Sequence, residues 1–450
     1  METKILSDYL CEIKYEDFSK DVVSYAKLAI LDYIGVAISA KDNEVEKIWR
    51  EYFFDEEDVK SESTSFCGFK KGSHMKVAAY NAACGHLLDL DDVHNSSITH
   101  PGTITIPAAF SMAEKLEKSG KDLITAVVCG YEICARVGEA INPGAYWFWH
   151  TTGVCGAFSS SVACGKLLGL NKEEMLNAVG SSGTESSGLW EFMKDGAMSK
   201  SLHTANATLC GIRAAKLAKL GFTGAKTILE GDKGLILALN KDGDKNALIK
   251  DLDKDHLKIM TDSFKPYACC RHTHSGNYAV EELKKEYDIN ISEIEKIIDR
   301  TYEVAINTAG ITNPKTSYAC KFSIPYCLSA MLLYGNLLGE VFSDSVTNRK
   351  EVKELAKKVE MIVEPSINST FINNPSCWPH EVEIHFKNGD VIKKRVDYPL
   401  GDFNNPFTFE IEIEKFRTIT LGKITKEEQD LIIDKIMKLE EIENVKGIFD

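Results

Sequence analysis

Gly85-His86-Leu87-Leu88-Asp89-Leu90-Asp91-Asp92-Val93-His94, followed shortly by Thr99-His100-Pro101-Gly102, is the stretch that decides how this chain folds around its chemistry. It holds three carboxylates and three imidazoles within eighteen residues of an otherwise apolar, small-residue segment. The pattern over residues 73–93 predicts a helix with Ser73 as N-cap, on which His86, Asp89 and Asp92 share one face. A second helix is expected after the loop 95–105, with Pro107 near its first turn and Gly120 as its C-cap signal.

His100 lies just before the second expected helix. Backbone N–H groups and the helix dipole favour an anionic ligand at such a position. The residue types alone fit a solvated, Asp-rich helix end equally well. The stretch therefore indicates a site only together with the rest of the chain.

Short motifs before, within and after this stretch occur along the chain in a definite order. They are Tyr80-Asn81-Ala82-Ala83, His86 through Asp92, residues 159–170, Ser187-Gly188-Leu189-Trp190-Glu191-Phe192, Asp195-Gly196, Lys200, Leu202-His203, Gly221-Phe222-Thr223-Gly224, Ile228-Leu229-Glu230-Gly231, Lys265-Pro266-Tyr267, Cys270-Arg271, His274, Lys321-Phe322-Ser323-Ile324-Pro325-Tyr326, Pro399-Leu400-Gly401-Asp402, Asn405-Pro406 and Lys415-Phe416. In this order and spacing the chain resembles the MmgE/PrpD superfamily, which includes 2-methylcitrate dehydratase, cis-aconitate decarboxylase and iminodisuccinate epimerase. The resemblance covers nearly the whole chain and is specific for the superfamily rather than for one activity.

The resemblance implies which residues carry the chemistry. The catalytic set that it implies is His100, His150, Lys200, Asp89 and Asp92, and the substrate-binding set is Lys265, Arg271, His274 and Cys270. We expect His100 to transfer the proton, oriented by the carboxylate of Asp89 or Asp92. His150 would be the partner acid or base, while Lys200 and Lys265 would bind substrate carboxylates, with Arg271 and His274 as further candidates for that binding.

Each of these residues also has a plain structural interpretation. His150 follows Tyr146-Trp147-Phe148-Trp149 and fits a packed histidine at the edge of an aromatic cluster. Lys200 and Lys265 alone would be solvated lysines, and Cys269 and Cys270 buried or pocket-lining thiols. We interpret His203 as structural.

The reaction that the resemblance implies is a lyase reaction without a cofactor. A base removes a proton from the carbon next to a carboxylate, an acid protonates the leaving group, and cations stabilise the developing charge. Dehydration or decarboxylation of a small, 2-methylcitrate-like polycarboxylate is the expected activity. An isomerase or epimerase acting on an iminodisuccinate-like dicarboxylate, and a catalytically silent binding protein, are the alternatives.

The chain departs from the family pattern at three places that bear on the substrate. Val93 stands where a threonine is common, Trp147-Phe148-Trp149 adds bulk before His150, and Ser201 replaces a common arginine after Lys200. Such a pocket would favour a substrate with fewer carboxylates or a larger apolar group than citrate. The substrate therefore need not be 2-methylcitrate.

Other cofactors find little support in the sequence. The chain has neither a Gly-x-Gly-x-x-Gly motif after a strand nor a phosphate-binding Gly-x4-Gly-Lys-Ser/Thr motif, and it has no Cys-x2-Cys pair. Two groups of residues could still bind a metal: Cys269, Cys270, His272 and His274 for zinc, and Asp89, Asp91, Asp92 and His94 for a hard cation. The first group has no second paired ligand segment and has Arg271 among its members. We expect no metal and no cofactor.

Composition restricts the partners and the compartment. The 450 residues carry 67 acidic and 53 basic side chains, a surplus that would repel nucleic acid and anionic membranes. The longest apolar segment, residues 25–40, is interrupted by Lys27 and Asp32, so we expect no membrane span. The start of the chain has no secretory pattern, and the 13 scattered cysteines fit reduced thiols in a cytoplasm. The resemblance implies a homodimer.

Hydrophobic periodicity predicts a mainly α protein with a second, α+β domain. Helical patterns include residues 22–37, 106–116, 123–140 and 205–219, then 275–287, 324–337, 349–358 and 426–441. Strand-like runs cover 295–306, 359–363, 382–386 and 391–396, and Asn388-Gly389 predicts a hairpin between the last two. We expect a large discontinuous helical domain over 1–263, an α+β lid domain over 264–398, and a return segment with a C-terminal helix over 399–450.

Overall fold

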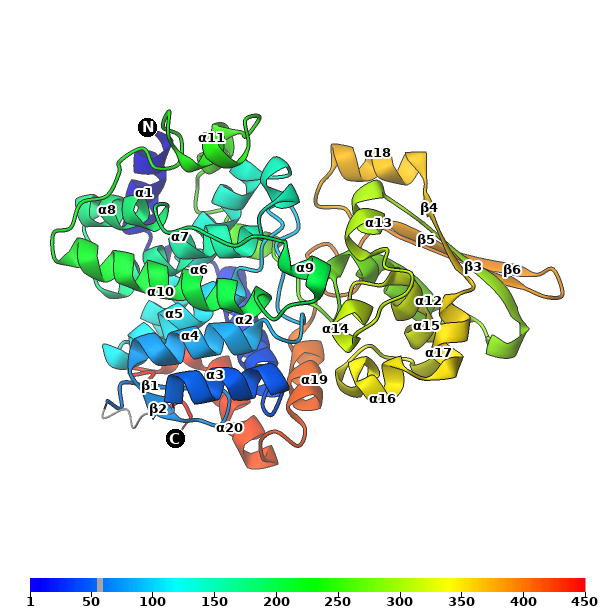
Figure 1. Cartoon of the computed structure of the whole chain (residues 1–450). Helices are drawn as coiled ribbons and strands as arrows, with labels where there is room; N and C mark the ends of the chain where they lie inside the picture. Colours follow the sequence, from blue (N-terminus) through cyan, green and yellow to red (C-terminus); the bar gives the residue numbers. More distant parts are fainter. Residues whose placement is uncertain (55–59, 450) are drawn as a thin grey trace. The chain divides into compact units, whose positions relative to one another are not determined.

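The computed structural model describes residues 1–54 and 60–449 and divides into two units (Figure 1). Unit 1 comprises Met1–Leu87, Asp91–Asp262 and Thr408–Asp450, and unit 2 comprises Leu88–Leu90 and Ser263–Phe407. Unit 1 is mainly helical and unit 2 is a smaller α+β unit, as the periodicity predicts. The chain returns to unit 1 at Thr408, later than the predicted residue 399.

Unit 1 is a layered bundle of helices. Its elements are α1 (Glu2–Glu12), α2 (Lys20–Ser39), α3 (Glu44–Phe54), the short hairpin β1 (Ser63–Thr64) and β2 (Lys71–Gly72), α4 (His74–Gly85), α5 (Gly102–Lys115), α6 (Gly120–Ile141), α7 (Thr151–Leu167), α8 (Lys172–Ser182), α9 (Phe192–Asp195), α10 (Lys200–Lys219), α11 (Leu235–Leu239), α19 (Phe409–Thr420) and α20 (Lys426–Met437). Helix α7 packs against α5, α6, α8 and α10, and all but one of its residues are buried. The small residues of α7, such as Gly153 and Gly156, let these neighbours approach closely.

Helix α2 is long and apolar enough to cross a membrane by length and composition, yet 89% of its most apolar window is buried within the structure. Its polar residues have buried partners from the end of the chain. Asp32 forms an ion pair with Lys415 of α19, and Lys27 forms one with Glu440 at 2.8 Å. The C-terminal segment is thus held in unit 1 by buried charges as well as by apolar packing.

Unit 2 is built on a four-stranded sheet. The sheet order is β4 (Val359–Val363), β3 (Ile294–Thr301), β5 (His380–Phe386) and β6 (Val391–Val396), with β3 parallel to β4 and the other pairs antiparallel. Its helices are α12 (His274–Glu286), α13 (Glu303–Ala309), α14 (Ser317–Cys320), α15 (Ile324–Tyr334), α16 (Asp344–Thr347), α17 (Lys350–Ala356) and α18 (Pro365–Asn373). Helix α12 packs on β5 and β6, and Gly389 forms the predicted turn between these strands with φ +90°.

Two predictions about the decisive stretch are wrong. The predicted helix over 73–93 ends at Gly85, because the backbone then leaves helical geometry: His86 has φ −102° and ψ 0°, and Asp89 is left-handed with φ +56°. The next helix, α5, ends at Lys115, and Gly120 begins α6 rather than capping α5. Pro107 lies inside α5, beyond its first turn. Residues 86–101 therefore form turns between two helices, not a helical face.

The contact between α7 and α10 supplies a test of this packing. A Cβ atom on Gly211 of α10 would lie 2.0 Å from Ser160 Oγ and 2.5 Å from the backbone nitrogen of Ser161. Because backbone cannot move aside cheaply, we expect Gly211→Ala to lower the free energy of unfolding by about 1–3 kcal/mol. Chemical denaturation measures this change. Lys219→Ala, on the exposed end of α10, is the control, and equal stability of the two variants would contradict the packing described.

Candidate active site

Four helix ends bring the polar side chains of unit 1 together. His86 is the C-cap residue of α4, and His100 directly precedes Pro101, the N-cap of α5. His150 is the N-cap of α7, and Lys200 is the first residue of α10. Three helix N-termini therefore converge where these side chains meet, and their dipoles favour an anion there.

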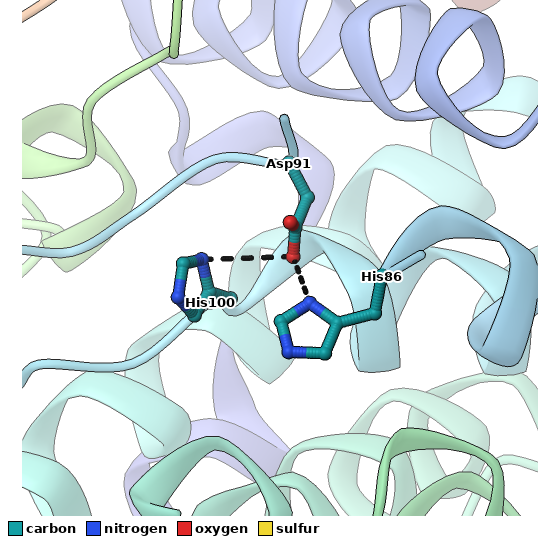
Figure 2. A group of neighbouring side chains, drawn as sticks. All are labelled: His86, Asp91 and His100. Atoms are coloured by element: carbon teal, nitrogen blue, oxygen red, sulfur yellow. Dashed lines mark hydrogen bonds and ion pairs between the residues drawn. The ribbon is translucent and has the colours of Figure 1, made fainter. Parts of the chain in front are cut away.

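Asp91 is the carboxylate that lies between His86 and His100 (Figure 2). Its Oδ2 accepts a hydrogen bond from His86 Nδ1 at 2.7 Å and lies 3.6 Å from His100 Nδ1, so both imidazoles face the same oxygen. The side chains of Asp91 and His86 are fully buried, whereas His100 keeps 15% of its side-chain surface exposed. His100 is thus the ring of this trio that solvent or a ligand can reach.

The tautomer of His100 follows from its backbone contact. Its Nδ1 lies 2.6 Å from the carbonyl oxygen of Asp92, and a carbonyl can only accept, so Nδ1 carries the proton. The neutral ring then keeps its basic lone pair on Nε2. We expected a side-chain carboxylate of Asp89 or Asp92 to orient His100; the Asp92 carbonyl and the Asp91 carboxylate do so instead.

The Asp92 carboxylate has another task. It accepts from the backbone N–H of Gly102 at 3.0 and 3.1 Å and from Tyr131 Oη at 2.5 Å, so it caps the start of α5. Burial raises the pKa of Asp92 to about 7, although its hydrogen bonds with Asp262 and Tyr131 oppose the shift. Asp92 therefore positions the helix that follows His100.

Two further imidazoles continue the cluster from α7 and α10. His150 Nε2 lies 3.4 Å from His86 Nε2, and His150 Nδ1 lies 3.1 Å from His203 Nδ1. Burial, together with the charge of nearby His86 and Lys200, lowers the pKa of His150 well below its usual range and that of His203 to about 4. Both rings are therefore neutral at neutral pH. His150 also packs against Trp190 with ring centroids 4.7 Å apart, in line with its aromatic surroundings in the sequence.

Lys200 supplies the positive charge of this group. It is only 5% exposed, and its charge contributes to the low pKa of both His150 and His203. A buried ammonium next to neutral imidazoles, at a helix N-terminus, suits a negatively charged ligand. The structure thus brings the predicted residues His100, His150 and Lys200 into one cluster.

A cavity of about 570 Å³ opens beside His203. Its other lining residues include Trp149, Leu189, Phe192, Leu202 and Asn206. The side chains of Trp147 and Phe148, which we expected to add bulk to the pocket, are 76% and 64% exposed instead.

The remaining predicted residues lie in unit 2. Lys265 is fully buried, and its Nζ donates to the Asp89 carbonyl at 3.1 Å and lies 3.4 Å from the Asp89 carboxylate. Asp89 adopts a left-handed conformation, with φ +56°. The chain therefore separates the two carboxylates that we paired: Asp92 belongs to unit 1 and Asp89 to unit 2.

Arg271, His274 and Cys270 form a second buried group in unit 2. Arg271 Nη2 pairs with Asp402 at 2.8 Å, and its Nη1 lies 3.3 Å from His274 Nδ1. Burial and the charges of Arg271 and Lys265 lower the pKa of His274 well below its usual range. Cys270 is 7% exposed, and its backbone N–H bonds to the Lys321 carbonyl. The Arg271 pairing fits a structural role at least as well as the predicted binding of substrate.

Three members of the unit 1 cluster were missing from the predicted set. His86 and Asp91 lie inside the decisive stretch. The predicted helix over 73–93 places Asp89 and Asp92, rather than Asp91, on the same face as His86. Gly85 could have signalled the end of that helix, since glycine is typical of helix C-termini. His203, which we interpreted as structural, contacts His150 directly.

His86, Asp91 and His100 could offer metal ligands, since suitable atoms of the three lie within 4.8 Å of one another in the described part of the chain. Their hydrogen bonds argue against it. Nδ1 of His86 faces a carboxylate and Nδ1 of His100 a carbonyl, so both Nδ1 atoms carry protons, and each ring keeps its lone pair on Nε2. An ion bound by Asp91 and the two Nδ1 atoms together would have to displace both protons.

Comparison with known proteins identifies the chain's relatives. Residues 4–247 match the MmgE/PrpD N-terminal domain, and residues 267–440 match the MmgE/PrpD C-terminal domain. A cis-aconitate decarboxylase of Aspergillus terreus is 29% identical over 473 residues, which cover 97% of this chain and 92% of that protein. The Homo sapiens cis-aconitate decarboxylase is 26% identical over 96% of this chain and 90% of its own length. A 2-methylcitrate dehydratase of Escherichia coli is 23% identical over 62% of this chain and 59% of its own length.

The hydrogen bonds at His86 and His100 predict how the cluster responds to metal. Calorimetric titration of chelator-treated protein with Zn²⁺ should show no stoichiometric binding, and the melting temperature should not rise. One equivalent of bound Zn²⁺, lost in His86→Gln, would contradict this expectation.

His94, the last residue of the decisive stretch, predicts a pH effect on stability. Its Nδ1 bonds to Ser97 and its Nε2 to Thr261, and burial lowers its pKa to about 4, although Glu139 opposes the shift. Between pH about 6.5 and 4, the unfolded chain binds a proton that folded His94 does not, so the free energy of unfolding falls as pH falls.

Chemical denaturation across this pH range tests the effect. The slope of the free energy of unfolding against pH should be smaller in His94→Gln than in the wild-type protein, by an amount that corresponds to about one proton at most. His256→Gln is the control, because a hydrogen bond to Asp253 raises the pKa of this exposed histidine. An undiminished slope in His94→Gln would contradict the buried, neutral state of His94.

Proposed function

Because this chain belongs to the MmgE/PrpD family, we propose that it is a lyase that acts on a small polycarboxylate by proton transfer at the carbon next to a carboxylate, without a cofactor. The observation that carries this proposal is the convergence of His86, His100, His150 and Lys200, with buried Asp91 between His86 and His100. Neutral imidazoles can exchange protons with carbon, and an ammonium group at helix N-termini can stabilise the enolate-like charge that develops.

Decarboxylation of a cis-aconitate-like tricarboxylate is the preferred reaction. The cis-aconitate decarboxylases align with nearly the whole chain, whereas the 2-methylcitrate dehydratase aligns with less than two thirds of it. Dehydration of a 2-methylcitrate-like acid is the second candidate, supported by that shorter match. Dehydration needs a base that removes a proton from carbon, decarboxylation needs an acid that gives a proton to carbon, and both need a group that binds the carboxylate.

His100 is the proton-transferring group in this proposal. Its Nδ1–H is held by the Asp92 carbonyl and faces Asp91, so Nε2 is the atom that exchanges protons with the substrate. In dehydration Nε2 accepts the proton from carbon, and in decarboxylation His100 first binds a proton at Nε2 and then gives it to carbon. The imidazolium formed in this way is stabilised by the Asp91 carboxylate at 3.6 Å. The reaction therefore does not create an isolated buried charge.

Lys200 binds a substrate carboxylate and His150 is the partner acid or base. The helix N-termini at His150 and Lys200 add fixed positive potential to the ammonium charge. Lys265, buried in unit 2, is a further candidate for carboxylate binding.

The activity is tested with cis-aconitate, 2-methylcitrate, citrate and iminodisuccinate in D₂O. Loss of carbon dioxide or of water, followed by mass spectrometry, separates the two lyase reactions. Deuterium uptake without loss of either would instead indicate an isomerase. No turnover and no exchange with any acid would contradict the proposed function.

Substitution of the two central residues tests their roles. His100→Ala and Lys200→Ala should each lower kcat/KM by about 100-fold or more, as loss of a general base or a charge-stabilising group does. Lys219→Ala, at the exposed far end of α10, is the matched control and should keep wild-type activity. Wild-type rates in either site variant would contradict the assigned role.

A further inference from the structure

One residue of the cluster has no role in the reaction proposed above. His203 lines the 570 Å³ cavity and is half-buried, whereas His150 and His86 behind it are 2% and 1% exposed. The contacts from His203 run through His150 to His86 and end at Asp91, at 3.1, 3.4 and 2.7 Å. Each ring inside this series uses its two nitrogens for two different contacts. His150 contacts His203 through Nδ1 and His86 through Nε2, and His86 contacts Asp91 through Nδ1.

We propose that His203, His150 and His86 form a proton relay that links the cavity beside His203 to the Asp91 carboxylate. The relay rests on the proposed lyase function and adds to it the route by which protons reach the buried site. His203 acts through His150 in this scheme, so it is a positioning and relay residue rather than one that contacts substrate.

The contacts set one consistent pattern of protons along the relay. The Asp91 carboxylate accepts, so His86 carries its proton on Nδ1 and offers the Nε2 lone pair. His150 must then donate from Nε2 and accept at Nδ1, and His203 donates from Nδ1. The lone pair of His203 is left on Nε2, on a residue that lines the cavity.

A proton that enters shifts every bond of the relay by one place. It binds His203 Nε2, the Nδ1 proton of His203 passes to His150 Nδ1, and the Nε2 proton of His150 passes to His86 Nε2. One proton has entered, and one positive charge now lies on His86, paired with Asp91 at 2.7 Å. The low pKa values of His203 and His150, caused by burial and by Lys200, keep those two rings from retaining the charge.

The preferred reaction needs such a supply. When a carboxylate leaves as carbon dioxide, its bonding electron pair stays on carbon, and one proton is consumed to form the new C–H bond. The proton stored on His86 lies beside the His100 ring, with ring centroids 5.1 Å apart. In the last step of the proposal it passes from His86 Nε2 to the Nε2 lone pair of His100, which returns His86 to its neutral form, and His100 then gives it to carbon. Dehydration consumes no net proton from solvent, so the relay matters most for decarboxylation.

Kinetics of two His203 variants test the relay. In weak buffer, His203→Gln and His203→Ala should lower kcat by roughly 100-fold, the lower end of the range for loss of a proton-transfer group, and should leave KM nearly unchanged. The solvent isotope effect on kcat should rise, because proton delivery becomes rate-limiting. Added imidazole should restore kcat of His203→Ala in a saturable manner, since it can occupy the space of the missing ring.

Leu202→Ala is the matched control, because Leu202 lines the same cavity but carries no proton. It should show no response to imidazole. If wild-type protein turns over substrate but the His203 variants keep its kcat, or lose kcat without rescue by imidazole, the relay is wrong and the proposed function stands.

A measurement without substrate tests the relay even if none of the acids is turned over. Nitrogen-15 NMR of the labelled histidines, assigned with single variants, should show His150 and His203 exchanging which nitrogen is protonated at one shared midpoint as pH falls. Separate midpoints, or no exchange of the protonated nitrogen at either ring, would overturn the relay even if no substrate is turned over.

Discussion

The buried Asp91 carboxylate is the group on which the rest of the site depends. A carboxylate without water around it is costly unless donors surround it, and here His86 donates directly while His100 faces the same oxygen. Because Asp91 only accepts, it decides which nitrogen of His86 is protonated. The protonated nitrogen of His86 in turn determines which nitrogens of His150 and His203 carry protons, because each ring must donate to or accept from the next.

Helix ends, rather than helix faces, carry this site. The turns between α4 and α5 hold His86, Asp91 and His100, while the first residues of α7 and α10 supply His150, Lys200 and His203. The helices themselves are packed through small residues such as Gly156 and Gly211, which keeps the helix starts in place. Tight packing of the helices holds the polar side chains at their ends in fixed positions. Such an arrangement preorganises a site that stabilises a charged ligand or transition state.

Much of the fold could be predicted from hydrophobic periodicity. The bounds of β4 and β6 match the predicted runs 359–363 and 391–396, because β-branched runs beside a strong turn signal leave few alternatives. The cluster residues His100, His150 and Lys200 came from the family resemblance, since no local pattern reveals that segments so far apart in sequence meet.

The errors had a common physical origin. Periodicity extends a helix through Gly85 because it does not reveal the non-helical backbone at His86 and the left-handed conformation of Asp89. As a result the sequence predicts Asp89 or Asp92, rather than Asp91, as the carboxylate that orients His100. It does not reveal a site role for His203, because the contact of His203 with His150 is a tertiary one. Such contacts depend on how helices pack, which one sequence does not state.

Neutron diffraction from deuterium-exchanged crystals tests the central claim most directly. The account predicts deuterium on Nδ1 of both His86 and His100, directed at the Asp91 carboxylate and the Asp92 carbonyl, with Asp91 ionised. Deuterium on Asp91 itself, or a bare Nδ1 on either ring, would contradict it.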